Sequence, residues 1–334
     1  MSTIEVTSQP AAAPAGRDRT RTRTRALLVE HSMTIAYVVL FAVLAATVQN
    51  FASVANIVGL MLSVAQIGMV ACTMMLCLAS RDFDLSVGST IAFAGVLGAI
   101  VLERTGSVTL AVLAGLGSGA LIGAGNGVLI AYLRVNALIA TLATMLMVRG
   151  LAFIASHGQA VGINSDAFID FGDARIGGLP LPVLVAGACF LVFGVLLNHT
   201  VFGRNTLAIG GNPEAARLAG VKVEKLRVWI FLLQGLVTGL AGLILASRIT
   251  SGQPNAAQGF ELDVISACVL GGVSLQGGKA RIFGVLIGVL IMGTVENVMN
   301  LMDVDAFYQY LMRGVILLAA VLLDQLKTRG ERRS

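Results

Sequence analysis

The sequence predicts an all-α protein that crosses a membrane about ten times. Of its 334 residues, 56% are hydrophobic and only 12% are charged, and the mean hydropathy is +0.86. In ordinary soluble domains about a quarter of the residues are charged. The 39 glycines and 6 prolines suit closely packed helices better than the weak alternating pattern of a membrane β-barrel. These observations exclude a soluble domain and favour a helical bundle in lipid.

Ten apolar runs define the expected elements, since about 20 apolar residues are needed to span a bilayer as a helix. Their approximate ranges are 33–49, 56–79, 86–103, 107–132, 137–155, 182–198, 228–247, 261–274, 282–300 and 306–323. The eighth run is short and contains Gly271 and Gly272, so we expect a half-helix there. Residues 33–325 then form one transmembrane domain, with a disordered tail at 1–32 and a second tail at 326–334.

Basic residues gather at the two tails and at the breaks near Arg134, 199–227 and Lys279, which is the pattern of a cytoplasmic face. An even number of crossings puts all of these on one side. The longest opposite loop, 156–182, carries three aspartates and one arginine. We therefore expect both termini to be cytoplasmic. Membrane topology also explains the +5 net charge, so no nucleic-acid partner is expected.

Glycines indicate how the helices pack. One run has glycine at every fourth position, which lets a neighbouring backbone approach closely. These residues are Gly115, Gly119, Gly123 and Gly127, and shorter pairs occur at Gly235 with Gly239 and at Gly284 with Gly288. Two polar, glycine-containing breaks, 78–89 and 270–284, also resemble each other, as in transporters built from two related halves.

The stretch GGVSLQGGKA, residues 271–280, resembles a phosphate-binding loop, but Val273 and Ala280 stand where that motif needs a glycine and a hydroxyl residue. The chain therefore has no ATP site of this kind. No metal site is expected either, because the cysteines lack metal-binding spacing and no histidine lies near them. They are Cys72, Cys77, Cys189 and Cys268.

Asp82 and Asp84 at the first break allow two interpretations. A pair of carboxylates could bind a metal diphosphate, as in membrane prenyl-diphosphate enzymes, but a second aspartate-rich cluster is absent from the sequence. Asp84 and Ser86 could instead order the loop and cap the following helix. The second interpretation is preferred.

Polar residues inside the apolar runs mark a polar seam, because charges in a bilayer usually face the bundle interior. Arg149, Gln234 and Arg313 belong to it, and Gln253 lies on an outer loop where its amide could bind sugar hydroxyls. Whether the seam touches a substrate or bonds only to itself stays open, and no catalytic residue stands out. The candidate pathway or gating residues are Asp82, Asp84, Ser86, Asn126, Gln253, Glu296 and Asn297.

The segment 202–229 is polar and predicts a short exposed helix at 213–219. Asn212 is a good N-cap, Pro213 fits the first turn, Glu214 complements the helix dipole, and Gly220 fits the position after the helix. A capped helix outside the lipid, between two spans, suggests docking to a partner. The contacting residues would be Asn212, Pro213, Glu214, Ala215, Ala216, Arg217 and Gly220.

FGRNTLAIGGNPEAARLAGV, from that segment, resembles the cytoplasmic coupling segment of the permease subunits in bacterial ABC importers for monosaccharides. DFDLSVGS, VISACVLGGVSLQGGKARIFG, NALIATLATMLMVRGLAFI and GTVENVMNLM are similar to other parts of this group, so the resemblance covers about residues 33–325. This chain departs from the group at two positions. Arg81 stands where the members of the group usually have glycine, and Phe83 stands where many of them have isoleucine. These departures leave the flexibility of the first break open.

The resemblance implies a type II permease bundle, like that of vitamin B12 importers, in a bacterial inner membrane. Two permease chains, in a homodimer, would form the pathway. A cytoplasmic ATPase subunit would hold ATP and Mg and engage the coupling segment, and a periplasmic binding protein would deliver the sugar. The match favours L-arabinose. The chain itself would bind no cofactor and catalyse no reaction. An ion-coupled secondary transporter, with a titrating Glu296, and the prenyl-diphosphate enzyme are the competing hypotheses.

Overall fold

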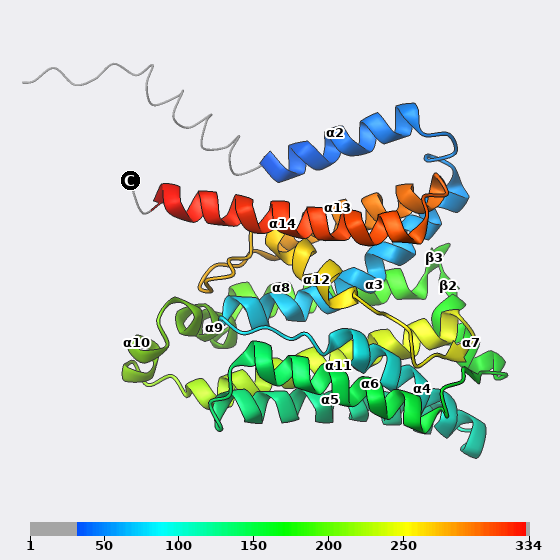
Figure 1. Ribbon diagram of the computed structural model, residues 1–334, viewed down its shortest axis with the longest axis horizontal. Coiled ribbons are helices and arrows are strands. Elements are labelled where there is room, and N and C mark those ends of the chain that lie inside the picture. Colours follow the sequence, from blue (N-terminus) through cyan, green and yellow to red (C-terminus); the bar gives the residue numbers. More distant parts are fainter. Residues whose placement is uncertain (1–31, 332–334) are drawn as a thin grey trace, which may run out of the picture.

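A computed structural model describes residues 32–331, which form thirteen helices and four two-residue strands (Figure 1). The helices are α2 (Ser32–Thr47), α3 (Val54–Ala79), α4 (Val87–Thr105), α5 (Val108–Ala131), α6 (Ala137–Ala155), α7 (Asp166–Asp173), α8 (Leu181–His199), α9 (Val201–Gly211), α10 (Pro213–Leu218), α11 (Val223–Arg248), α12 (Phe260–Leu270), α13 (Ile282–Leu301) and α14 (Ala306–Glu331). The strands are β1 (Val161–Gly162), β2 (Arg175–Ile176), β3 (Leu179–Pro180) and β4 (Ser251–Gly252).

Seven helices of the described chain are long and apolar enough to cross a membrane, namely α3, α4, α5, α6, α8, α11 and α13. Two shorter apolar stretches, Met33–Thr47 and Ala306–Leu322, lie in α2 and α14. A helix therefore occurs at every predicted apolar run, and the protein is a multi-pass helical membrane protein. The prediction for the N-terminal tail falls largely outside the described residues, and α14 continues to Glu331, past the predicted end at 323.

The glycine stripe of α5 faces α11, which confirms the prediction that a neighbouring backbone approaches it closely. A Cβ atom on Gly119 would overlap the carbonyl oxygen of Gly235, and one on Gly123 would overlap that of Phe231. A Cβ on Gly235 would in turn overlap the carbonyl oxygen of Gly119. The two backbones thus touch, and any side chain larger than hydrogen would separate the helices.

Two stretches of non-helical backbone run into the bundle, 80–86 before α4 and 253–259 before α12 (Figure 1). They meet where α4 begins, because a Cβ on Gly88 would overlap the carbonyl oxygen of Ala257. Such backbone is tolerated at membrane depth only where protein or a water-filled cavity surrounds it. In the first stretch, Asp82, Asp84 and Ser86 are all buried.

The end of the bundle opposite α10 carries a small folded cap (Figure 1). β1 pairs antiparallel with β4, and β2 with β3. Helix α7 packs its fully buried Phe168 in a second apolar core. The Ser247 hydroxyl donates to the carbonyl oxygens of Phe168 and Ile169 at 2.7 and 2.9 Å, which attaches the cap to α11.

Candidate functional site

Helix α10 is a capped, self-contained turn and a half at one end of the bundle. The Asn212 Oδ1 atom accepts hydrogen bonds from the backbone N–H groups of Glu214 and Ala215, both at 3.1 Å. Pro213 is the first helical residue, and Gly220 has a φ of +86° just beyond the helix. These features confirm the predicted helix and its caps, with its end at Leu218. The Leu218 side chain is 90% exposed, an unusual position for a large apolar group.

Arg217 joins α10 to the start of α11. Its Nη1 atom lies 2.8 Å from Glu214 Oε1 and its Nη2 atom 2.6 Å from Glu224 Oε1. Hydrogen bonds to Glu224 and Glu214 raise the pKa of Arg217. The pairs are open to solvent, so they contribute little to stability. The pair with Glu224 connects α10 to the first turn of α11.

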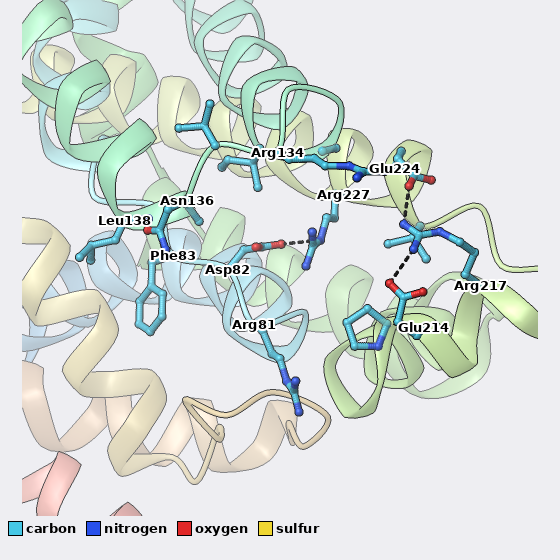
Figure 2. Close-up of a pocket in the computed structure, with 16 residues that line it drawn as sticks. Arg81, Asp82, Phe83, Arg134, Asn136, Leu138, Glu214, Arg217, Glu224 and Arg227 are labelled. Carbon is cyan, nitrogen blue, oxygen red and sulfur yellow. Dashed lines mark hydrogen bonds and ion pairs between the residues drawn. The ribbon is translucent and has the colours of Figure 1, made fainter.

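A cavity of about 760 Å³ lies beside α10 (Figure 2). The turn between α5 and α6, the start of α11 and the break after α3 form its other walls. Its charged lining consists of Arg81, Arg134, Arg217, Arg227, Asp82, Glu214 and Glu224. The capped helix, the break and α11 therefore share one polar space.

Asp82 links the break to α11. Its carboxylate is buried, and its Oδ2 atom lies 3.0 Å from Nε of Arg227, an ion-pair contact without hydrogen-bond alignment (Figure 2). Burial raises the pKa of Asp82 to about 6, and it outweighs the opposing attraction of Arg227 and a hydrogen bond from Ser80. A charge change at Asp82 would therefore act directly on the contact with α11.

Asp84 binds a different set of partners from Asp82. Its Oδ1 atom accepts from the backbone N–H of Ser86 at 2.9 Å and from the Ser86 hydroxyl at 2.6 Å. It orders the loop, as predicted. The prediction that Ser86 caps α4 is wrong, because the Ser86 side chain makes no hydrogen bond to the first turn of α4. The hydroxyl is instead occupied by Asp84.

A buried polar chain continues from Ser86 to α5 and α6. The Asn126 Nδ2 atom donates to Ser86 Oγ at 3.0 Å, and the Thr144 hydroxyl donates to Asn126 Oδ1 at 2.7 Å. All of these side chains are buried. The structure thus brings the predicted residues Asp84, Ser86 and Asn126 together, bonded to one another and to Thr144.

The other predicted pathway residues lie apart from this chain. Asn297 exchanges two hydrogen bonds of 3.0 Å with Asn56, and Gln253 donates to the Ser251 hydroxyl at 3.3 Å. Glu296 accepts from Arg313 at 3.1 Å.

Two charged clusters inside the bundle were not assembled from the sequence. Arg313 on α14 lies 3.4 Å from Asp263 on α12, in addition to its contact with Glu296. Arg149 on α6 donates to the carbonyl oxygens of Pro254 and Ala256 at 2.8 and 2.7 Å. The sequence shows these arginines only as charges within apolar runs. It does not identify their partners, because the partners are distant along the chain. No group of three His, Cys, Asp or Glu side chains suited to a metal occurs among residues 32–331.

Comparison with known proteins places this architecture in a family. Residues 56–321 match the family described as branched-chain amino acid transport system / permease component. The L-arabinose transport system permease protein AraH of Escherichia coli K12 is 56% identical, over 91% of this chain and 92% of its own. The L-arabinose ABC transporter permease protein AraH of Azospirillum brasilense is 52% identical, over 92% and 91%.

A ribose permease is a more distant relative. The ribose import permease protein RbsC of Escherichia coli K12 is 41% identical, over 91% of this chain and 96% of its own. No solved structure matches the chain. The family match covers most of the chain and agrees with the multi-pass helical fold, so this protein belongs to the branched-chain amino acid transport system / permease component family.

Proposed function

We propose that this chain is the membrane-spanning permease subunit of an ATP-driven importer for L-arabinose. Its identity to two L-arabinose permeases, 56% and 52%, exceeds its 41% identity to a ribose permease. The single structural observation that carries the proposal is α10, a capped helix with an exposed leucine, outside the long apolar helices. A partner that supplies ATP hydrolysis is needed, because this sequence lacks a phosphate-binding loop of the usual pattern.

In the proposed assembly, two copies of the chain form the pathway in a bacterial inner membrane. The fold would be the type II bundle of vitamin B12 importers, with ten crossings and both termini in the cytoplasm. A cytoplasmic ATPase subunit, which binds ATP and Mg, docks on α10. A periplasmic protein delivers the sugar to the opposite end, where the cap formed by α7 and the strands lies. The chain has no enzymatic activity of its own.

Movement of α10 has a direct route into the bundle. Arg217 fixes α10 to the start of α11 through Glu224, and Arg227 on α11 contacts Asp82 in the first break. The glycine contacts transmit displacement of α11 to α5, since touching backbones move together. Closure of the ATPase would thus shift α11, α5 and the break together, and alternate the access to the pathway.

The docking role is tested with Leu218→Asp, Glu214→Lys and Gly220→Val. The first two change exposed groups of α10, and the third forces a β-branched residue into a φ of +86°. We expect each variant to reach the membrane but to lose most sugar uptake, and Leu218→Asp to lose co-purification with the ATPase. The control is Gly187→Val, at an exposed glycine of α8 whose Cβ position has no other atom within 4 Å. This variant should retain uptake.

Uptake is measured in cells that lack their own permease and regain this chain, with a panel of labelled pentoses and hexoses. L-Arabinose should be taken up fastest, and deletion of the ATPase should abolish uptake. Normal uptake by all three α10 variants would refute the docking role. Uptake that survives loss of the ATPase and stops with an uncoupler would favour a secondary transporter.

A further inference from the structure

Arg81 occupies an unusual backbone conformation at the end of α3. Its φ is +69°, in the left-handed region that L side chains rarely adopt and that glycine adopts without strain. The arginine side chain makes two hydrogen bonds to carbonyl oxygens far away in sequence. Its Nε atom donates to Gln276 at 2.6 Å, and its Nη2 atom donates to Gly211 at 3.0 Å.

Three segments meet at Arg81 with their backbones in contact, and we call this place the three-segment junction (79–81, 210–211 and 276–278). The Gly278 N–H donates to the carbonyl oxygen of Ala79 at 2.9 Å. A Cβ on Gly210 would overlap that same oxygen, and a Cβ on Gly277 would overlap the Arg81 side chain. The junction is therefore packed too closely for one segment to shift without the other two.

The junction lies where the moving parts of the proposed transporter meet. Residues 210–211 end α9 and lead directly into Asn212 and α10. Residues 79–81 end α3 and begin the first break, and 276–278 lie in the loop between the short helix α12 and α13. A displacement of α10 that passes through α9 therefore reaches both polar breaks, 78–89 and 270–284, at this point.

We propose that Arg81 is a positioning residue that locks α9 to both breaks, so that movement of α10 reaches them as one displacement. This inference rests on the proposed function, in which the ATPase moves α10. Arg217 and Glu224 carry movement from α10 to α11, whereas Arg81 carries it to the ends of α3 and α12. One guanidinium can do this because its planar fork donates in two directions at once.

The test uses Arg81→Gly in the full complex of permease, ATPase and binding protein in proteoliposomes. Glycine accepts the positive φ, so the protein should remain folded with unchanged thermal stability, while the two side-chain hydrogen bonds are lost. We expect the sugar transported per ATP hydrolysed to fall about fivefold or more, the lower end of typical coupling between sites. Arg81→Lys keeps the charge but lacks the forked donors, and should restore only part of the ratio.

Arg104→Ala is the control, since it removes an exposed arginine from the last turn of α4 at the other end of the bundle, and it should leave the ratio unchanged. The inference is overturned if Arg81→Gly has the normal ratio, including the case in which transport and ATP hydrolysis fall in proportion. If the complex with the unchanged chain shows no ATP-linked uptake, the proposed function fails instead, which separates the two outcomes.

Discussion

Helices α5 and α14 are attached to the bundle by opposite means. Helix α5 has no charged residue, and its glycines bring its backbone against that of α11. Among the described side chains of α14, only Ala320 is buried, but Arg313 reaches two carboxylates, Asp263 on α12 and Glu296 on α13. The contact of α5 with α11 therefore depends on the size of a side chain, whereas α14 adds to its apolar contacts at Ile316, Leu317 and Ala320 an ion-pair contact that depends on charge.

The difference follows from lipid as a solvent. Apolar helices gain little from contacting each other instead of lipid, so their association relies on close van der Waals contact or on polar groups. A charge inside the bundle is costly unless it is paired. Close backbone contact is used where α5 meets α11, and charge pairing is used where α14 meets α12 and α13, so each contact should fail under a different substitution.

The largest effect is expected for Arg313→Met, which removes the cation between two carboxylates. Asp263 is buried and Glu296 is partly buried, so both would be left near each other without their partner. Removing one member of a buried ion pair costs about 3–5 kcal/mol. The change should appear as a large loss of thermal stability in detergent-purified protein.

The matched control is the triple variant Arg313→Met, Asp263→Asn, Glu296→Gln. It removes all three charges at nearly constant volume, and it should recover much of the lost stability, because uncompensated charge is the cause. A triple variant as unstable as Arg313→Met would show that the shape of the arginine, rather than its charge, attaches α14.

A smaller effect is expected for Gly119→Ala in α5. The new methyl group would meet the carbonyl oxygen of Gly235, and overpacking of this kind costs about 1–3 kcal/mol. Gly117→Ala is the control on the same helix, because nothing lies within 4 Å of its Cβ position. Thermal melting of the two variants should separate clearly, and equal melting would mean that α5 and α11 do not touch through their backbones.

The sequence could predict features that arise locally or periodically. Four glycines at a spacing of four identify the face of α5, and the caps of α10 are read from Asn212 and Gly220, because both depend on nearby residues. It could not predict pairs that depend on tertiary packing. Arg313 with Asp263 is one example, separated by 50 positions of chain.

The first break illustrates the same limit. An aspartate followed two residues later by a serine suggests a helix cap. For Ser86 the local rule fails, because its hydroxyl donates to Asp84 and accepts from Asn126, in a chain that reaches α6. Arg81 is similar, since only the fold shows that its φ is positive and that carbonyls from two other segments lie within its reach.

The smallest effect is expected for Gly314→Ala, which places a methyl group beside Arg313 in α14. Nothing lies within 4 Å of that Cβ position, so size should not matter, and alanine favours helix over glycine by about 1 kcal/mol or less. Thermal stability of the purified chain should be unchanged or slightly higher. A marked loss of thermal stability would mean that another backbone packs against the Gly314 face of α14, for example that of a second copy of the chain. Side-chain size would then matter for α14 as well as charge. The comparison with Gly119→Ala isolates the effect of side-chain size, because the same substitution is made at a glycine that faces a neighbouring backbone and at one that faces nothing within 4 Å.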